Sequence, residues 1–172
     1  MGTLNTTNLN VTGNWSSAPA GTIIQVQTAE AGPARQTISS ATPVAITDLS
    51  INFTPRNSTS KIIIQVYLNA THTYVASYGI FEDGSPTNST SGYTNTNESN
   101  MDMTYYGGSS STDHFQGNTF HTVLNANSTS TRTYQVYGTS AWEGSASTLY
   151  INNRDSNNMA SVSRMLIYEV AT

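Results

Sequence analysis

Histidines are the first side chains to consider, because imidazoles bind metals and transfer protons near neutral pH. The chain has three, His72, His114 and His121, and the last two lie seven residues apart. Zinc sites normally show a tighter paired spacing than this. We therefore expect no bound metal and place the histidines in polar loops and at strand edges. A site completed by symmetry, with one histidine from each of three chains, is the alternative.

Acidic residues gather around one stretch, Glu82-Asp83-Gly84-Ser85, with Glu98 and Asp102 beyond a long loop. Carboxylate oxygens of this kind suit calcium. The stretch lacks the regular Asp-x-Asn-x-Asp spacing of a calcium loop, however, and Asp-Gly is an ordinary sequence for a tight turn. We expect a turn here and no cofactor.

The sequence contains many residues that can act in catalysis, but no motif that brings them together. Hydrolysis of a glycan needs two carboxylates that face each other across a cleft, and nothing in the sequence positions such a pair. The 23 serines include no Gly-x-Ser-x-Gly elbow, so a Ser-His-Asp triad has no anchor either. We expect that the protein is not an enzyme.

Aromatic residues in polar, loop-like surroundings are the stronger functional signal. Such rings make binding contacts at low entropic cost, and sugar rings stack on them while acidic groups accept hydroxyl hydrogens. We predict a receptor surface on segments 83–100, 105–115 and 139–146. Its candidate residues are Tyr93, Tyr105, Tyr106, Trp142, Asp83, Glu98, Asp102 and Glu143. The alternative for each of these aromatic residues, and for Phe115, is that its ring packs over one end of the hydrophobic core and binds no receptor.

Composition limits the elements that carry these residues. Ser, Thr and Asn make up 68 of the 172 residues and charged types only 9%, which disfavours helical bundles, whose exposed faces need Glu, Lys, Arg and Ala. The six Lys and Arg residues are scattered and the pI is near 5.1, so we expect no nucleic-acid partner. Neither a secretory signal nor an apolar run of about 20 residues occurs, so we expect no membrane insertion.

Short apolar-alternating runs, separated by Gly, Pro, Ser, Asn and Asp, indicate an all-β head over residues 21–172. We predict an antiparallel β sandwich without a long helix. Its strands are expected at 22–28, 44–53, 61–69, 73–81, 103–106, 118–124, 131–138, 147–151 and 162–170. Residues 1–20 carry too few apolar groups for a core of their own, so we expect a short extended tether there.

Two of these runs, 61–69 and 162–170, are apolar on both faces, although the core of a sandwich covers only one face of a strand. In the run 162–170, Leu166, Tyr168 and Val170 lie on one side. The second faces then carry Ile63 and Tyr67 in the first run and Met165 and Ile167 in the other. Either a loop of the same chain covers these residues or another subunit does, and we predict that they form a contact between subunits.

Several short segments, taken in order, resemble the C-terminal head domains of phage tail fibres and related virion attachment proteins. These segments are Gly21-Thr22-Ile23-Ile24-Gln25-Val26, Ser58-Thr59-Ser60-Lys61-Ile62-Ile63-Ile64, Gly79-Ile80-Phe81-Glu82-Asp83-Gly84, Asn152-Asn153-Arg154 and Met165-Leu166-Ile167-Tyr168-Glu169-Val170. The resemblance spans roughly residues 21–172. It implies a β jelly roll similar to the trimeric heads of the tumour-necrosis-factor and C1q families.

The same resemblance implies a function and a location. The protein would be a homotrimer on the virion surface, in a tail fibre or on the capsid, in contact with other virion proteins and with a host-cell receptor, for which a glycan is one candidate. Residues 1–20 would then look like the end of a fibre shaft. Two alternatives are a structural decoration or capping protein with no receptor, and a free trimeric lectin.

Overall fold

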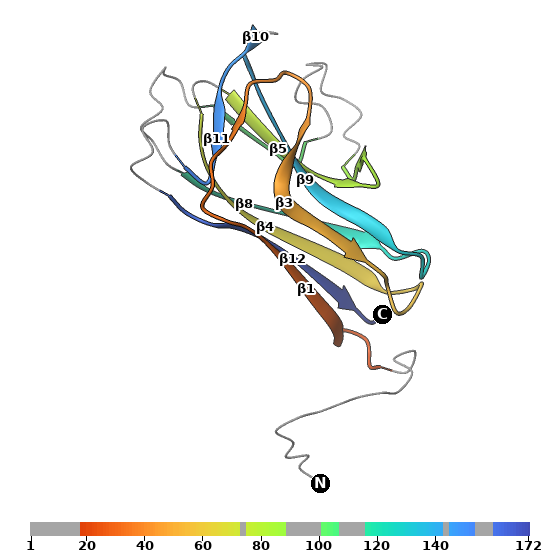
Figure 1. Ribbon diagram of the computed structural model, residues 1–172. Helices are drawn as coiled ribbons and strands as arrows, with labels where there is room; N and C mark the ends of the chain where they lie inside the picture. Colours follow the sequence, from red (N-terminus) through yellow and green to blue (C-terminus); the bar gives the residue numbers. More distant parts are fainter. Residues whose placement is uncertain (1–17, 73–74, 89–100, 107–115, 143–144, 154–159) are drawn as a thin grey trace.

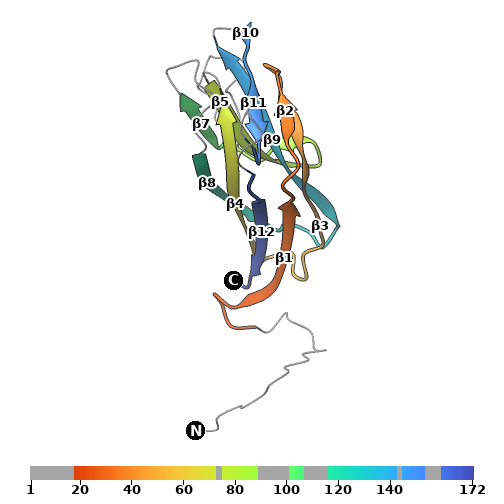
Figure 2. The same ribbon diagram turned by 60° about the vertical axis from the view of Figure 1, so that its left-hand side comes forward.

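The computed structural model describes residues 18–72, 75–88, 101–106, 116–142, 145–153 and 160–172. They form two six-stranded sheets, all of whose strand pairs are antiparallel. The sheets lie against each other as two layers (Figures 1 and 2). The expected all-β antiparallel sandwich is therefore confirmed, while the finer expectation of a jelly roll stays a prediction. The described residues contain no helix that is long and apolar enough to cross a membrane.

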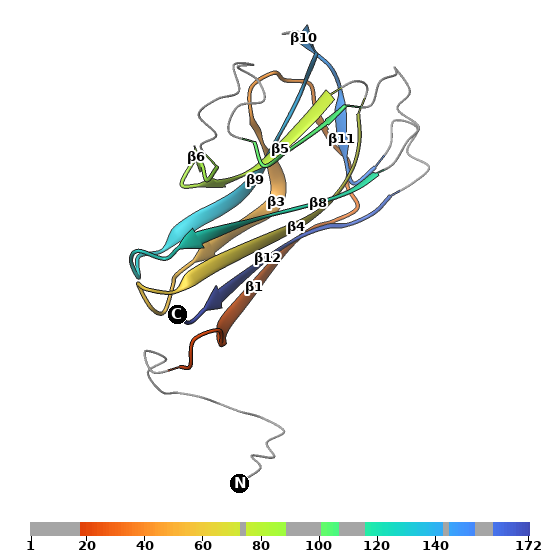
Figure 3. The same ribbon diagram turned by 180° about the vertical axis from the view of Figure 1, so that it is seen from behind.

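The first layer, which we call sheet A, has the strand order β1-β12-β4, with β8 on the far side of β4. β11 pairs with the last residues of β4, Ala70–His72, and β2 pairs with β11. Figure 3 shows β8, β4, β12 and β1 side by side in this order. The strands of sheet A are β1 (Ile23–Ala31), β2 (Gln36–Ile38), β4 (Lys61–His72), β8 (Gln116–Asn125), β11 (Leu149–Ile151) and β12 (Ser163–Val170).

The second layer, sheet B, has β9 and β5 at its centre, with β3 paired to β9 and β7 paired to β5. Its strands are β3 (Val44–Phe53), β5 (Val75–Glu82), β6 (Ser85–Pro86), β7 (Met103–Tyr106), β9 (Arg132–Trp142) and β10 (Ser145–Ala146). All nine predicted runs correspond to strands. Three short strands, β2, β6 and β10, were not predicted, because two or three residues show no alternation.

One expectation about sheet B needs a correction. Residues 139–142 were placed in a receptor-binding loop, but β9 continues through them to Trp142. The reason is the pairing with β5, which brings Thr139 and Ser140 opposite Ser77 and Ala76. Both Thr139 and Ser140 are buried, so these small polar residues are part of the packed sheet.

The core lies between the two sheets. Sheet A contributes the inward-facing residues of β4, such as Ile62 and Ile64, and sheet B contributes Tyr78, all fully buried. The Tyr78 ring stacks on that of Phe120, with ring centroids 6.2 Å apart, and so joins β5 to β8 across the core. Each fully buried side chain of this size contributes about 1.5–3 kcal/mol to folding.

The beginning of β1 lies beside the end of β12. The backbone N–H of Gly21 donates to the carbonyl of Ala171 at 2.8 Å, and the N–H of Ala171 donates to the carbonyl of Thr22 at 2.9 Å. Gly21 has φ of 86°, a conformation that glycine adopts without strain. The chain therefore enters and leaves the sandwich at the same end (Figure 1).

Candidate functional site: the outer face of sheet A

The side of sheet A that faces away from sheet B carries a row of apolar residues across four strands. Val26 of β1 lies opposite Tyr168 of β12, which lies opposite Ile63 of β4, which lies opposite Val123 of β8. Directly paired residues point to the same side of a sheet, so these four side chains form one continuous line.

Further apolar residues border this row. We call the whole set the outer apolar face, and it consists of Ile23, Val26, Ile63, Tyr67, Val123, Leu166, Tyr168 and Val170. Four of them are the large apolar residues most exposed in the described chain, with exposed fractions of 54% for Ile23, 48% for Val26, 45% for Tyr67 and 55% for Val123. Single exposed apolar residues are normal, but a contiguous apolar face marks an interaction surface.

Charged residues of this face lie at its two ends. Lys61 is at one end, where its Nζ donates to the side-chain oxygen of Asn125. Glu30 and Arg164 are at the other end and form an ion pair with a distance of 2.8 Å between Oε2 and Nε. Next to the apolar row, the line Thr28, Leu166, Gln65 and His121 adds polar groups to the same face. An apolar row with polar groups around it is the usual composition of a protein interface.

The residues predicted for the subunit contact lie on different faces of sheet A, and the contact itself stays a prediction. Ile63 and Tyr67 do lie on the outer face of β4. Met165 and Ile167 are fully buried in the core, so their assignment to a subunit contact is wrong. In β12 the outward-facing residues are those of the other side, Leu166 and Tyr168 among them.

The cause of this inversion is Glu169, which shares the inner side of β12 with Met165 and Ile167. A charged residue is expected outside, yet Glu169 is fully buried. Its carboxylate accepts the backbone N–H of Arg56 at 2.8 and 3.0 Å and that of Asn57 at 2.9 Å. The Gln25 side chain donates to it at 2.7 Å. Glu169 thus attaches the connection between β3 and β4 to sheet A. No local sequence pattern predicts this role.

Among the predicted receptor residues that the structure describes, Asp83 lies at one end of β5, and Tyr105, Tyr106 and Trp142 lie near the other. Tyr105 and Tyr106 pair with Ala76 and Val75 at the beginning of β5, whereas Asp83 follows its end. Trp142 ends β9, near the same end of the sheet as Tyr105 and Tyr106. The eight residues of β5 separate the two groups by roughly 25 Å at about 3.4 Å per residue. Tyr93, Glu98, Glu143 and Phe115 lie outside the described residues.

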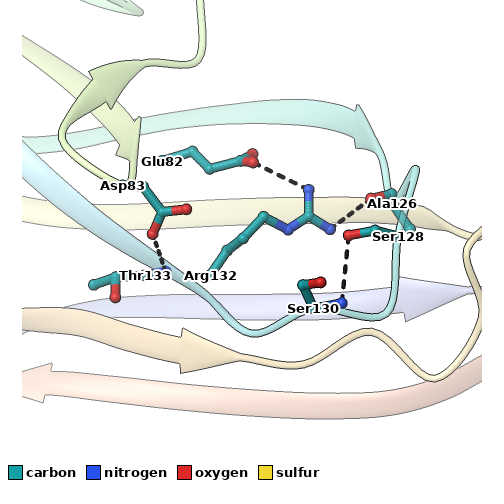
Figure 4. A network of polar contacts seen from close by, with 7 residues as sticks. All are labelled: Glu82, Asp83, Ala126, Ser128, Ser130, Arg132 and Thr133. Carbon is teal, nitrogen blue, oxygen red and sulfur yellow. Dashed lines mark hydrogen bonds and ion pairs between the residues drawn. The ribbon is translucent and has the colours of Figure 1, made fainter.

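Asp83 occupies the two-residue turn between β5 and β6. Asp83 and Gly84 have φ of 49° and 81°, as the left-handed conformation of a tight hairpin turn requires. The Oδ1 atom of Asp83 accepts the backbone N–H of Thr133 at 2.8 Å (Figure 4). The Asp-Gly turn expected from the sequence is confirmed, and this hydrogen bond holds it against β9.

Glu82, beside this turn, is held by Arg132. The Nη1 atom of Arg132 lies 3.0 Å from Oε1 of Glu82, and its Nη2 donates to the carbonyl of Ala126 at 2.6 Å (Figure 4). The Arg132 side chain is only 12% exposed, so this ion pair is less screened than one on the surface. The network links β5, β9 and the connection between β8 and β9.

Asp102 lies just before β7 and is partly buried. Its Oδ2 accepts the backbone N–H of Ile80 at 2.7 Å. Burial raises the pKa of Asp102 above its ordinary value, while the hydrogen bond from Ile80 and the charge of His121 act in the opposite direction. Asp102 therefore serves to attach the start of β7 to β5.

The histidines are placed separately. His72 is the last residue of β4 and is buried, which lowers its pKa, whereas His121 is exposed in the middle of β8. His114 lies outside the described residues. Within the described ranges, no three His, Cys, Asp or Glu side chains gather closely enough to hold a metal ion.

Comparison with known proteins gives only distant similarity. No protein-family model and no curated protein matches the chain. Among solved structures, it is similar to the T=1 particles derived from infectious bursal virus, with 15% identity, a TM-score of 0.39, and 87% of this chain covered against 37% of that one. It is also similar to the VP2 subviral particle of infectious bursal disease virus, with 16% identity and a TM-score of 0.39. That match covers 87% of this chain and 39% of the viral chain. The present chain thus spans less than half of either protein, and similarity at this TM-score carries no argument about function.

Proposed function

We propose that this chain is a non-enzymatic structural head of a virion, of the fibre or knob type, that assembles as a homotrimer through the outer apolar face of sheet A. The observation that supports the proposal is the row Val26, Tyr168, Ile63 and Val123, which crosses four strands without a charged residue. The resemblance of the sequence to trimeric heads favours three copies and a virion location.

The energetic reason is the exposure of this face to water. Complete burial of a valine or isoleucine side chain is worth about 1.5–3 kcal/mol, so each half-exposed residue would gain about 1 kcal/mol on contact with another copy. The ends of the face, with Lys61 on one side and the Glu30–Arg164 pair on the other, supply polar groups for the rim. Contact with another copy of the chain would therefore bury the apolar residues of this face.

The proposed assembly is tested by native mass spectrometry and sedimentation velocity. The parent chain should appear at three times its mass of 18.5 kDa. Ile63→Asp and Tyr168→Asp each place a charge in the middle of the contact and should give monomers. Thr129→Asp, at an exposed position in the connection between β8 and β9, is the matched control and should stay trimeric. A monomeric or dimeric parent, or trimeric Ile63→Asp and Tyr168→Asp variants, would contradict the proposal.

A role in host attachment is the second part of the proposal. Asp83, one of the predicted receptor residues, lines a surface pocket of about 440 Å³ together with Glu82, Ser85 and Thr87. Carboxylates and hydroxyls in an open pocket are suitable partners for the hydroxyl groups of a glycan. Tyr105 and Trp142, at the other end of β5, provide the alternative attachment surface.

Adsorption competition tests the role in attachment and shows which of the two candidate surfaces, at Asp83 or at Tyr105 and Trp142, binds the receptor. Purified head should block adsorption of the virus that carries it. Asp83→Asn keeps an oxygen for the Thr133 N–H and tolerates the left-handed conformation, so it probes the carboxylate alone. The Tyr105→Ala, Trp142→Ala double variant probes the opposite end. Failure of the parent head to block adsorption would favour a decoration or capping protein without a receptor.

A further inference from the structure

His121 lies on the side of sheet A that faces away from sheet B, beside the row of apolar residues. It lies opposite Gln65 of β4, in the line that continues through Leu166 to Thr28. Val123, two residues along β8, belongs to the outer apolar face, so the His121 side chain leaves the strand on the same side. His121 is exposed in the single chain. The contact proposed for the trimer would therefore cover an imidazole.

The charged groups of this face lie far from His121. Lys61 comes four residues before Gln65 along β4, or about 14 Å at about 3.4 Å per residue. Glu30 is paired with Arg164 and belongs to β1, which β12 and β4 separate from β8 by about 14 Å at about 4.8 Å per strand. Among the described residues of this face, no carboxylate is thus close enough to neutralise a protonated His121.

The other titratable groups of β4 and β12 do not interfere near neutral pH. Tyr67 and Tyr168 share the outer face with His121, and phenols ordinarily lose their proton only near pH 10. His72 is buried at the end of β4, on the inner side, and not on the outer face. Its surroundings belong to a single chain and stay the same when another copy covers the outer face.

Sheet B brings three carboxylates near β8. The charge of His121 lowers the pKa of Asp102, against the larger effect of burial, and the Asp102 carboxylate accepts the backbone N–H of Ile80. Glu82 and Asp83 line a pocket together with Leu124, which packs against the core on the inner side of β8. These carboxylates belong to the same chain as His121. Their attraction for an imidazolium is therefore the same with and without a neighbouring copy.

An imidazole in the contact makes the assembly sensitive to pH. Imidazole is the side-chain group that ordinarily takes up a proton between about pH 5 and 8. Water solvates the charged ring in the single chain, whereas a contact removes this water, and the adjacent Val123 and Gln65 carry no negative charge. The single chain thus binds the proton more readily than the assembly does. By linkage, the assembly weakens as the pH falls.

We propose that His121 makes the assembly pH-dependent, so that trimers are stable while its imidazole is neutral and dissociate when it is protonated. This inference rests on the proposed homotrimer and adds its regulation. Exclusion of the proton from an imidazole of ordinary pKa, about 6.5, weakens association about tenfold at about pH 5.5. Each trimer contains three copies of His121, so the trimer association constant should fall by up to about a thousandfold.

Sedimentation equilibrium of the unmodified chain at about pH 7.5 and pH 5.5 tests the proposal. We expect trimers at the higher pH and a trimer association constant at least about a hundredfold smaller at the lower pH. Circular dichroism at both values shows whether the subunits stay folded. Trimers that are equally stable at both values, or more stable in acid, overturn this inference and leave the proposed homotrimer intact. Monomers at the higher pH overturn both.

Three variants show whether His121 is the group responsible. His121→Gln keeps a polar side chain that takes up no proton, so it should associate equally at both pH values. His121→Lys carries a charge at both values and should associate weakly at both. Thr129→His is the matched control, because it adds an imidazole at an exposed position outside this face, and it should respond to pH as the parent does. A His121→Gln variant that responds to pH as strongly as the parent would assign the effect to another group and overturn the proposal.

Discussion

The two sides of β4 and β12 carry similar apolar residues and have different surroundings. On the inner side, Ile64 and Ile167 lie opposite each other and are fully buried against sheet B. On the outer side, Ile63 and Tyr168 also lie opposite each other and are only partly buried. The inner side includes a charged residue, Glu169, and the outer side is free of charge in its middle. Hydrophobicity alone therefore does not tell which side of a strand is the core.

The largest effect expected from this comparison is that of Glu169. Glu169→Ala removes a carboxylate that accepts hydrogen bonds from the Arg56 and Asn57 N–H groups and from the Gln25 side chain. We expect the free energy of unfolding to fall by about 4 kcal/mol, because each hydrogen bond to a charged group contributes about 1.5–3 kcal/mol. Urea denaturation measures the difference.

The matched control for this variant is Glu30→Ala on the outer side. Glu30 forms an exposed ion pair with Arg164, and such pairs are worth less than about 1 kcal/mol. Similar losses in the two variants would show that the buried carboxylate has no special role.

Adjacent residues of β12 provide the second test. Met165→Ala opens a cavity in the core and should lower the free energy of unfolding by about 3 kcal/mol without changing the assembly. Leu166→Ala, at the next residue, should lower the free energy of unfolding of the monomer by less than about 1 kcal/mol and should weaken the assembly. Denaturation at a concentration where the chain is monomeric, combined with sedimentation, separates the two effects. The reverse pattern would show that the two sides have been exchanged.

The smallest effect concerns His72, a titratable residue on the inner side of β4. Burial lowers its pKa below the ordinary 6.5. The unfolded chain then binds a proton that the folded chain does not, so the free energy of unfolding should fall as the pH is lowered through 6.5 toward the folded pKa. His72→Gln should flatten this dependence. Denaturation curves between about pH 5 and 8 are the measurement.

Most strands could be predicted because their apolar residues alternate over many positions. The range 44–53 coincides with β3, where Leu49, Ile51 and Phe53 alternate with polar residues. The orientation of β12 could not be predicted, since the partners of Glu169 lie more than a hundred residues away in the sequence. The irregularity in β3 could not be predicted either, because the extra residues between Ala45 and Ser50 show only in the pairing of β3 with β9.

The position of β12 has a consequence for the order of folding. This strand lies between β1 and β4, so sheet A cannot be completed until residues 163–170 have been synthesised and have left the ribosome. Pairing of residues so distant in sequence is slow, because a long loop must close before its contacts form. Until then the apolar residues of β1 and β4 lack their common neighbour and are open to aggregation. A nascent chain that stalls before Ser163 therefore has no route to the native sheet.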